Sequence, residues 1–197
     1  MVKKFTNLNS GNSARFAEGN RHLPQVEMWT DGACVSLDTI CPERNGCGGW
    51  AALLKTKTET SSVYGLSTET TSNRMELRAA IEGLRSITSS SLVHIYTDSA
   101  YVCNVVTKAK RWEALGFQRE KGRELKNPEM IKEYLEIASH HTVIVHKVTS
   151  HADQTPLENE MVDTLAVAMR NLAASQKMFN MHAGVKIDTD HMEIKSS

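Results

Sequence analysis

The stretch LVHIYTDSAYVCNVV, residues 92–106, changes character at Asp98. The residues before Asp98 are mostly apolar, β-branched or aromatic, which is typical of a buried strand. The residues after it take up the spacing of a helix. A strand that is followed at once by a helix favours an α/β fold with parallel crossovers, and it places Asp98 at the carboxyl end of the strand.

The rest of the chain extends this alternation. Three strands joined by short connections come first and predict antiparallel hairpins, while the later strands are separated by helices and predict parallel pairing. An apolar stripe with helical spacing (Leu77, Ala80, Ile81, Leu84, Ile87) marks the first helix. We therefore expect an α/β fold with a mixed five-stranded sheet flanked by helices. The expected strands are 26–30, 49–56, 61–67, 92–98 and 142–148, and the expected helices lie within 68–87, 100–112, 127–141 and 156–176.

The length of 197 residues suits one domain, which we place at residues 25–175. Residues 1–24 are polar and predict a flexible N-terminal arm, and residues 176–197 predict a flexible C-terminal tail. The sequence has neither an apolar run long enough for a bilayer nor a signal-peptide core, so we expect a cytoplasmic protein without membrane contact. The formal net charge is +0, so a nucleic-acid partner would need a local basic patch.

The chain has four cysteines, Cys34, Cys41, Cys47 and Cys103, and they form no CxxC pair. Free thiols in a reducing compartment are the expected state. A zinc site at Cys34, Cys41 and Cys47 is the alternative, although their wide spacing fits no standard zinc knuckle.

Four acidic residues stand where they can meet. Asp31 and Asp98 each follow an apolar strand, and neighbouring strands lie only about 4.8 Å apart. Glu76 lies in the first helix on a line with Ala80, beside the apolar stripe. Asp163 lies in the last helix, four residues after Asn159. Each acid alone is as well explained by a turn, a cap or a solvated helix face.

Together, however, the four acids would form a cluster of like charges, for which divalent cations are the usual compensation. Two Mg²⁺ ions, or Mn²⁺ in their place, would sit about 3.5–4 Å apart and clamp a phosphodiester. We therefore interpret Asp31 as a metal ligand at the end of a strand.

Five segments resemble, in order, the motifs of type 1 ribonuclease H, in the bacterial form with a basic protrusion. They are TDGAC, GCGGWAALL, TTSNRMELRAAIEGL, IYTDSAYV and SHADQTPLENEMVDTLA, within residues 26–170. The resemblance implies that the domain at 25–175 is a ribonuclease H catalytic domain. It implies an endonuclease that hydrolyses the RNA strand of RNA–DNA hybrids by two-metal-ion catalysis, leaving 5′-phosphate and 3′-hydroxyl ends, and acting as a monomer.

The resemblance also implies roles for individual residues. Asp31, Glu76, Asp98 and Asp163 become the metal ligands, and His151 becomes a mobile histidine for proton transfer or product release. Thr71 and Asn127 match positions that hold a phosphate of the DNA strand. Asn73 and the backbone around Cys34 and Glu76 match the surface that reads ribose 2′-hydroxyls, which is how proteins tell RNA from DNA.

The segment from Lys108 to Lys126 holds seven Lys or Arg against three Glu, a net charge of +4. A solvated helix with salt bridges is one interpretation. The position matches the basic protrusion of the family, which favours hybrid binding along the phosphates. The residues that we expect to contact substrate are Lys108, Lys110, Arg111, Trp112, Phe117 and Lys121.

Some positions depart from the family pattern. The loop after Asp31 is longer than in the usual bacterial form and lacks Asn-Pro-Gly, so Asn45 or Asp38 would have to substitute. Ser72 stands where Asn is common, and the spacing from His151 to Asp163 is longer. These departures bear on substrate contacts and leave every expected metal ligand in place.

Two other functions are the alternatives to this one. A ribonuclease H-fold protein with another nucleic-acid substrate, such as a transposase, integrase or resolvase, would lack the TTSNRMEL block. A non-catalytic hybrid-binding module would have lost at least one of the four acids.

Overall fold

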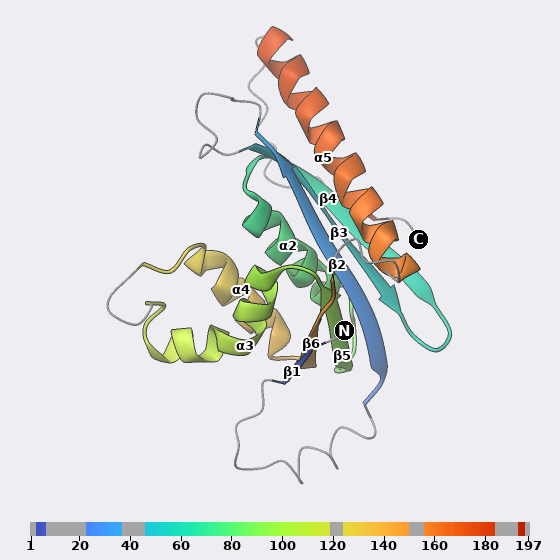
Figure 1. The fold of residues 1–197 in the computed structure, drawn as a ribbon, viewed down its shortest axis with the longest axis vertical. Helices are drawn as coiled ribbons and strands as arrows, with labels where there is room; N and C mark the ends of the chain where they lie inside the picture. Colours follow the sequence, from blue (N-terminus) through green and yellow to red (C-terminus); the bar gives the residue numbers. More distant parts are fainter. Residues whose placement is uncertain are drawn as a thin grey trace.

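The computed structural model describes residues 3–6, 23–36, 46–118, 124–149, 156–183 and 193–195. Its centre is a single sheet with the strand order β1-β6-β5-β2-β3-β4-β7, seen nearly edge-on in Figure 1. The strands are β1 (Lys3–Thr6), β2 (Gln25–Val35), β3 (Gly46–Lys55), β4 (Thr60–Thr70), β5 (Leu92–Thr97), β6 (Thr142–Lys147) and β7 (Glu193–Lys195).

The five central strands form the mixed sheet that the sequence predicts. β2, β3 and β4 pair antiparallel as successive hairpins, whereas β5 pairs parallel with β2 and β6 pairs parallel with β5. The parallel pairs are those whose connections contain helices, since a parallel connection has to cross back over the sheet. The predicted fold class is therefore confirmed.

Two short strands extend this sheet at its edges. β1 lies in the predicted arm and pairs antiparallel with β6, and β7 lies in the predicted tail and pairs antiparallel with β4. The last helix also continues beyond residue 175, to Ala183. Main-chain hydrogen bonds hold strands this short at a sheet edge, so their side chains carry little periodic signal in the sequence.

Helices cover the sheet on both faces (Figure 1). The helices are α2 (Ser72–Arg85), α3 (Ala100–Ala114), α4 (Pro128–Ala138) and α5 (Leu157–Ala183). α2, α3 and α4 lie over one face and enclose the main core with buried residues of β2, β5 and β6. α5 lies over β2, β3 and β4 on the other face, where Val162 and Ala166 are buried against Trp29. None of the helices that the structure describes is both long and apolar enough to cross a bilayer.

Four of the five residues of the predicted apolar stripe are buried on α2, whereas Ile87 lies beyond the end of the helix and is half-buried. Leu77, Ala80, Ile81 and Leu84 are fully inaccessible to solvent. Gly83 belongs to the same contact, because a Cβ built there would come within 2.4 Å of the sulfur of Met28. α2 therefore lies unusually close to β2, and this fixes the height of every other residue on the helix above the sheet.

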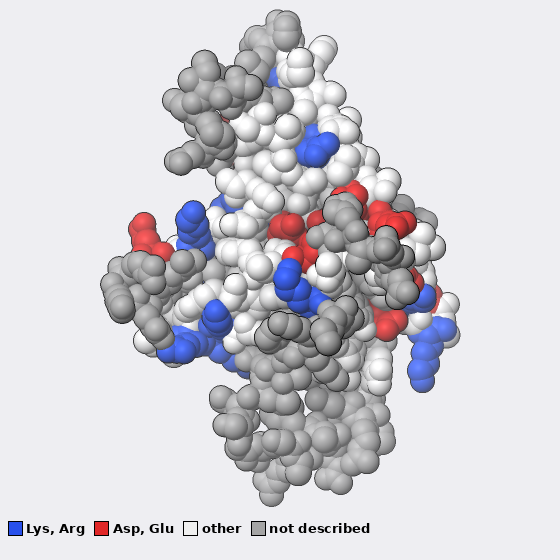
Figure 2. All heavy atoms as spheres, viewed as in Figure 1, with Lys and Arg blue, Asp and Glu red and all other residues white. Residues whose placement is uncertain are grey.

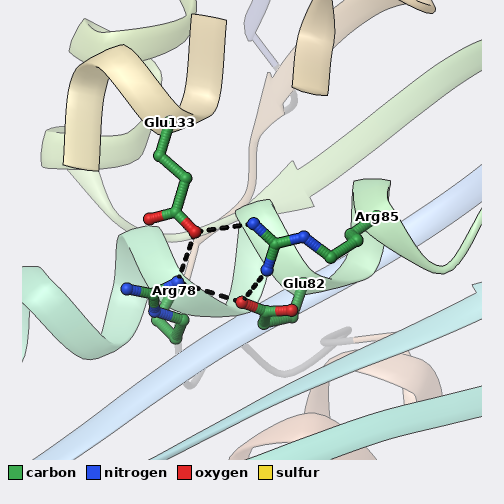
Figure 3. Close-up of polar contacts among 4 residues, drawn as sticks. All are labelled: Arg78, Glu82, Arg85 and Glu133. Carbon is green, nitrogen blue, oxygen red and sulfur yellow. Dashed lines mark hydrogen bonds and ion pairs between the residues drawn. The ribbon is translucent and has the colours of Figure 1, made fainter. Parts of the chain in front are cut away.

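An ion-pair network joins α2 to α4 (Figure 3). Glu82 accepts hydrogen bonds from Arg78 at 3.0 Å and from Arg85 at 2.5 Å. Glu133 of α4 accepts from the same two arginines, at 2.8 and 2.6 Å. Only 8% of the Glu82 side chain is exposed, so the two guanidinium groups compensate a nearly buried charge.

Candidate active site

Asp31 and Asp98 are brought together by the parallel pairing of β2 with β5. The last pair in this register joins Trp29 to Tyr96, so Asp31 and Asp98 each lie two residues beyond it. β5 ends at Thr97, directly before Asp98, as the sequence predicts. The prediction that β2 ends at Asp31 is wrong, since β2 continues to Val35. Its second half keeps pairing with β3, up to the pair of Val35 with Cys47, after β5 has ended.

Glu76 reaches the same place because α2 crosses directly over Gly32. A Cβ built on Gly32 would lie 2.2 Å from the main-chain nitrogen of Glu76, far inside van der Waals contact. Only a glycine leaves room for the helix backbone at this height. Gly32 is therefore required for the packing of α2 on β2 at the site, besides being the residue that follows Asp31 in the chain.

Three carboxylates meet at this crossing. One carboxylate oxygen each from Asp31, Glu76 and Asp98 lies within 4.8 Å of the others. Oε2 of Glu76 is buried and has no hydrogen-bond partner among the described residues. A buried carboxylate oxygen without a partner is costly. A divalent cation that accepts hard oxygen ligands would satisfy it, and the donor set fits Mg²⁺ or Mn²⁺.

Asp163 approaches from the opposite face of the sheet, on α5. A Cβ on Gly49 of β3 would lie 2.3 Å from the carbonyl oxygen of Ala166, so α5 also packs directly on backbone. This contact brings Asp163 near Asp31, whose pKa its charge raises, although Asp163 lies outside the group of three acids whose oxygens are within 4.8 Å of one another. Asp163 is exposed, whereas the other three acids are half-buried. All four acids singled out in the sequence are therefore neighbours, with Asp163 at the open side of the cluster.

The environment raises the pKa of two of these carboxyl groups. Burial, followed by the charges of Asp98 and Asp163, raises the pKa of Asp31 to about 7, although the main-chain amide of Gly32 opposes the shift. Burial and the charges of Asp31 and Asp98 raise the pKa of Glu76 to about 9. The ion-free cluster therefore retains protons at neutral pH, as expected for close carboxylates that lack a cation.

The residues expected to hold a DNA phosphate lie around the first turn of α2. Thr71 is the residue before the helix, and Asn127 stands before α4 with a left-handed backbone, φ 53°. Arg74 of α2 donates to the side-chain oxygen of Asn127 at 3.3 Å and pairs with Glu129 at 2.5 Å. The amide of Asn127 in turn donates to the hydroxyl of Tyr101 at 3.1 Å. Hydrogen bonds to Arg74 and Tyr101 therefore fix the side chain of Asn127, and the sequence alone does not indicate these two partners.

Asn73 and Cys34 flank the cluster on the α2 side. Asn73 is exposed in the first turn of the helix, and Cys34 is half-buried near the end of β2 with its thiol directed to the carbonyl of Thr70. Cys34, Cys47 and Cys103 are free thiols, as predicted. Within the described residues the groups that could hold a metal include no cysteine; Cys41 lies outside these residues.

The basic segment is only partly described. Lys108, Lys110 and Arg111 are exposed on α3, and Figure 2 shows basic side chains over this helix, apart from the acidic group near the middle of the same face. Trp112 and Phe117 are half-buried and pack against the main core. Lys132 lies over the Phe117 ring at 4.8 Å from its centre. The two aromatic residues thus anchor α3 and leave only part of their surface for a ligand.

Several predicted residues lie outside the described part of the chain. They are His151, Lys121, Asp38 and Asn45. Their expected roles stay predictions. Sequence reasoning also missed residues that the structure places at the site: Arg74, Tyr101 and Lys147.

The fold and the cluster together define the class. A mixed sheet with carboxylates from two central strands and from helices on both faces is the architecture of ribonuclease H-like nucleases. The family model for RNase H matches residues 24–171, and the chain belongs to the RNase H family. It is a hydrolytic ribonuclease.

Curated relatives agree along most of their length. The chain is 36% identical to the Ribonuclease H of Thermoanaerobacter sp. (strain X514) over 149 residues, which cover 75% of this chain and 90% of the relative. It is 37% identical to the Ribonuclease H of Legionella pneumophila (strain Corby) over 143 residues, which cover 72% and 94%.

Solved structures share the fold. LC9-RNase H1, described as a type 1 RNase H with the type 2 active-site motif, aligns with a TM-score of 0.65 and 25% identity over 77% of this chain and 74% of that one. The RNase H domain of PFV aligns with a TM-score of 0.62 and 20% identity over 76% and 96%.

Proposed function

We propose that this protein cleaves the RNA strand of RNA–DNA hybrids by two-metal-ion hydrolysis, leaving 5′-phosphate and 3′-hydroxyl ends. The observation that carries the proposal is the meeting of Asp31, Glu76 and Asp98 within 4.8 Å, with a buried oxygen of Glu76 left without a partner. Membership of the RNase H family supports the choice of substrate. The expectation of a monomeric, cytoplasmic enzyme comes from the sequence alone.

The four carboxylates would together coordinate the two ions. Asp31 lies at the centre, since the charges of Asp98 and Asp163 raise its pKa and its own charge raises the pKa of Glu76. When bound, Mg²⁺ ions would activate a water molecule and stabilise the leaving oxygen of the phosphodiester. Asp163, which is exposed, stands where an incoming phosphate and its water remain accessible.

The surroundings of the cluster would select the hybrid. We assign Asn73 and the backbone near Cys34 to the ribose 2′-hydroxyls, because only the RNA strand offers them. Thr71 and Asn127 would hold a phosphate of the DNA strand, with Arg74 close to Asn127. Lys108, Lys110 and Arg111 would follow the phosphate backbone from α3.

The likeness to known structures is compatible with this substrate. A foamy viral protease–reverse transcriptase solved in complex with an RNA/DNA hybrid aligns with a TM-score of 0.58 at 18% identity. That level of identity supports the fold alone. The hybrid as substrate of this chain rests on its family and on the site described above.

A matched set of substrates tests the proposal. RNA–DNA hybrid, dsRNA, dsDNA and ssRNA of one sequence are incubated with the protein in Mg²⁺ and, in parallel, in EDTA. We expect cleavage of the hybrid alone, in the RNA strand and only with Mg²⁺, and end-labelling should show 5′-phosphate products. Cleavage of dsDNA would favour another substrate, and binding without cleavage would favour a non-catalytic module.

A further inference from the structure

Lys147 is the last residue of β6 and lies beside the carboxylate cluster. It pairs in register with Thr97, the residue before Asp98. Its side chain alternates with that of buried His146 and points to the same face as Val145, which packs in the core under α2, α3 and α4. There the ammonium of Lys147 donates a hydrogen bond to the main-chain carbonyl of Asp98.

The charge of Lys147 reaches beyond this hydrogen bond. Its field lowers the pKa of Glu76, against the burial and the two aspartates that raise it. It also acts on the thiol of Cys103 on α3. The hydrogen bond to Asp98 and the effect on Glu76 place the charge of Lys147 beside two of the three residues that supply the clustered carboxylates.

We propose that Lys147 is a built-in counter-cation of the cluster: a positioning residue that fixes the backbone of Asp98 and balances part of the carboxylate charge before any metal ion is bound. This rests on the metal site proposed above. In the ion-free protein, the ammonium lowers the repulsion between Asp31, Glu76 and Asp98. The carboxylates can then stay together in an arrangement that is ready for ions.

The same charge has the opposite effect once ions are present. A fixed positive charge repels a divalent cation. At the same distance, the repulsion energy is twice that between two single charges. Lys147 should therefore weaken Mg²⁺ binding while it stabilises the ion-free fold. This pair of opposite effects is what separates a counter-cation from a side chain that merely packs.

The test compares three variants with the wild type. Lys147→Met keeps most of the side-chain volume and removes the charge, and Lys147→Arg keeps the charge. Lys177→Met is the matched control, because Lys177 also donates to a main-chain carbonyl, that of Thr68 at 2.9 Å, but does so far along α5, beside Cys47. Melting temperatures are measured at pH 9 in EDTA and in saturating Mg²⁺, and Mg²⁺ binding is measured by calorimetry.

We expect Lys147→Met to lower the Tm in EDTA by about 3 °C more than in Mg²⁺. We also expect it to bind Mg²⁺ several-fold more tightly than the wild type. Lys147→Arg should restore wild-type behaviour, and Lys177→Met should change the two melting temperatures equally.

Equal losses of Tm in EDTA and Mg²⁺ for Lys147→Met would overturn the proposal and leave Lys147 a packing residue. Weaker Mg²⁺ binding by Lys147→Met would overturn it as well. If Mg²⁺ neither binds the wild type nor raises its Tm, the metal site itself is contradicted, which is a separate failure.

Discussion

The main-chain nitrogen of Glu76 occupies the space that a side chain on Gly32 would need: a Cβ on Gly32 would lie 2.2 Å away from it. Gly32 follows Asp31 in the chain and donates its amide to the Asp31 carboxylate at 2.8 Å. One glycine therefore sets both the distance of α2 from the sheet and the orientation of Asp31. The carboxylates from a strand and from a helix come together through this contact.

Gly32→Ala should push α2 away from β2 and separate Glu76 from Asp31. We expect the rate of hybrid cleavage to fall by at least about 10²-fold, because displacements of about 1 Å at a reacting centre have effects of this size. Stability should fall too, so Ile131→Val serves as the control, because Ile131 of α4 is fully buried in the main core and supplies no group to the cluster. A Gly32→Ala enzyme with a wild-type kcat would show that α2 can shift without harm.

The raised pKa values of Asp31 and Glu76 predict how stability depends on pH without metal. Both groups hold protons to higher pH in the folded protein than in the unfolded chain, from 3.8 to about 7 for Asp31 and from 4.5 to about 9 for Glu76. Their contribution is fully present below about pH 4 and is lost as the pH rises through these values. Urea unfolding in EDTA should therefore show stability that declines from pH 5 to pH 9.

Saturating Mg²⁺ should flatten this decline, because the ion replaces the protons. Glu76→Gln should remove the part of the decline that lies above pH 7, since an amide does not titrate. A stability that is constant from pH 5 to pH 9 in EDTA would contradict the clustering of ionised carboxylates in the folded protein.

Changing Lys108, Lys110 and Arg111 together to Gln should raise the KM for hybrid more than it lowers kcat. Each lost phosphate contact should reduce the slope of log affinity against log salt by about 0.9. Lys57→Gln, an exposed lysine between β3 and β4, provides the control for a lost charge elsewhere. If the slope of log affinity against log salt is unchanged from the wild type, these three residues do not contact phosphates and are ordinary solvated residues.

Glu82→Gln tests whether the network of Figure 3 is separate from catalysis. The change removes one of the two carboxylates that Arg78 and Arg85 both contact, and Glu133 is the other. We expect the free energy of unfolding to fall by about 1–3 kcal/mol, below the value for a fully buried pair because Arg85 is 40% exposed. The kcat should not change, and a large loss of kcat in a folded variant would mean that α4 helps to position α2 for the reaction.

The sequence predicts the central five strands and four helices because their signals are local. The alternation of strand and helix, and the buried stripe of α2, follow from residues close together in the chain. The four acids are predictable for the same reason, since each marks a visible junction or helix edge. Whether the four acidic side chains lie close together depends on the order of the strands in the sheet. The alternation of strands and helices along the sequence largely determines this order.

Other features depend on contacts between distant segments. The close approaches at Gly32 and Gly49 involve helices 40 or more residues away, and glycine in a strand has several possible reasons. Lys147 looks like any polar residue at the end of a strand until β6 is placed beside β5. The continuation of β2 past Asp31 depends on its pairing with β3, which no local pattern reveals.

The most direct test of the metal-dependent active site is single-turnover cleavage of an RNA–DNA hybrid by Glu76→Gln in saturating Mg²⁺. The variant removes one charge from the cluster and keeps the shape of the side chain, and Glu136→Gln on the exposed side of α4 is its control. We expect Glu76→Gln to bind the hybrid as tightly as the wild type, to remain folded and to show no measurable cleavage, while Glu136→Gln cleaves at the wild-type rate. Cleavage by Glu76→Gln at a rate near that of the wild type would contradict the account.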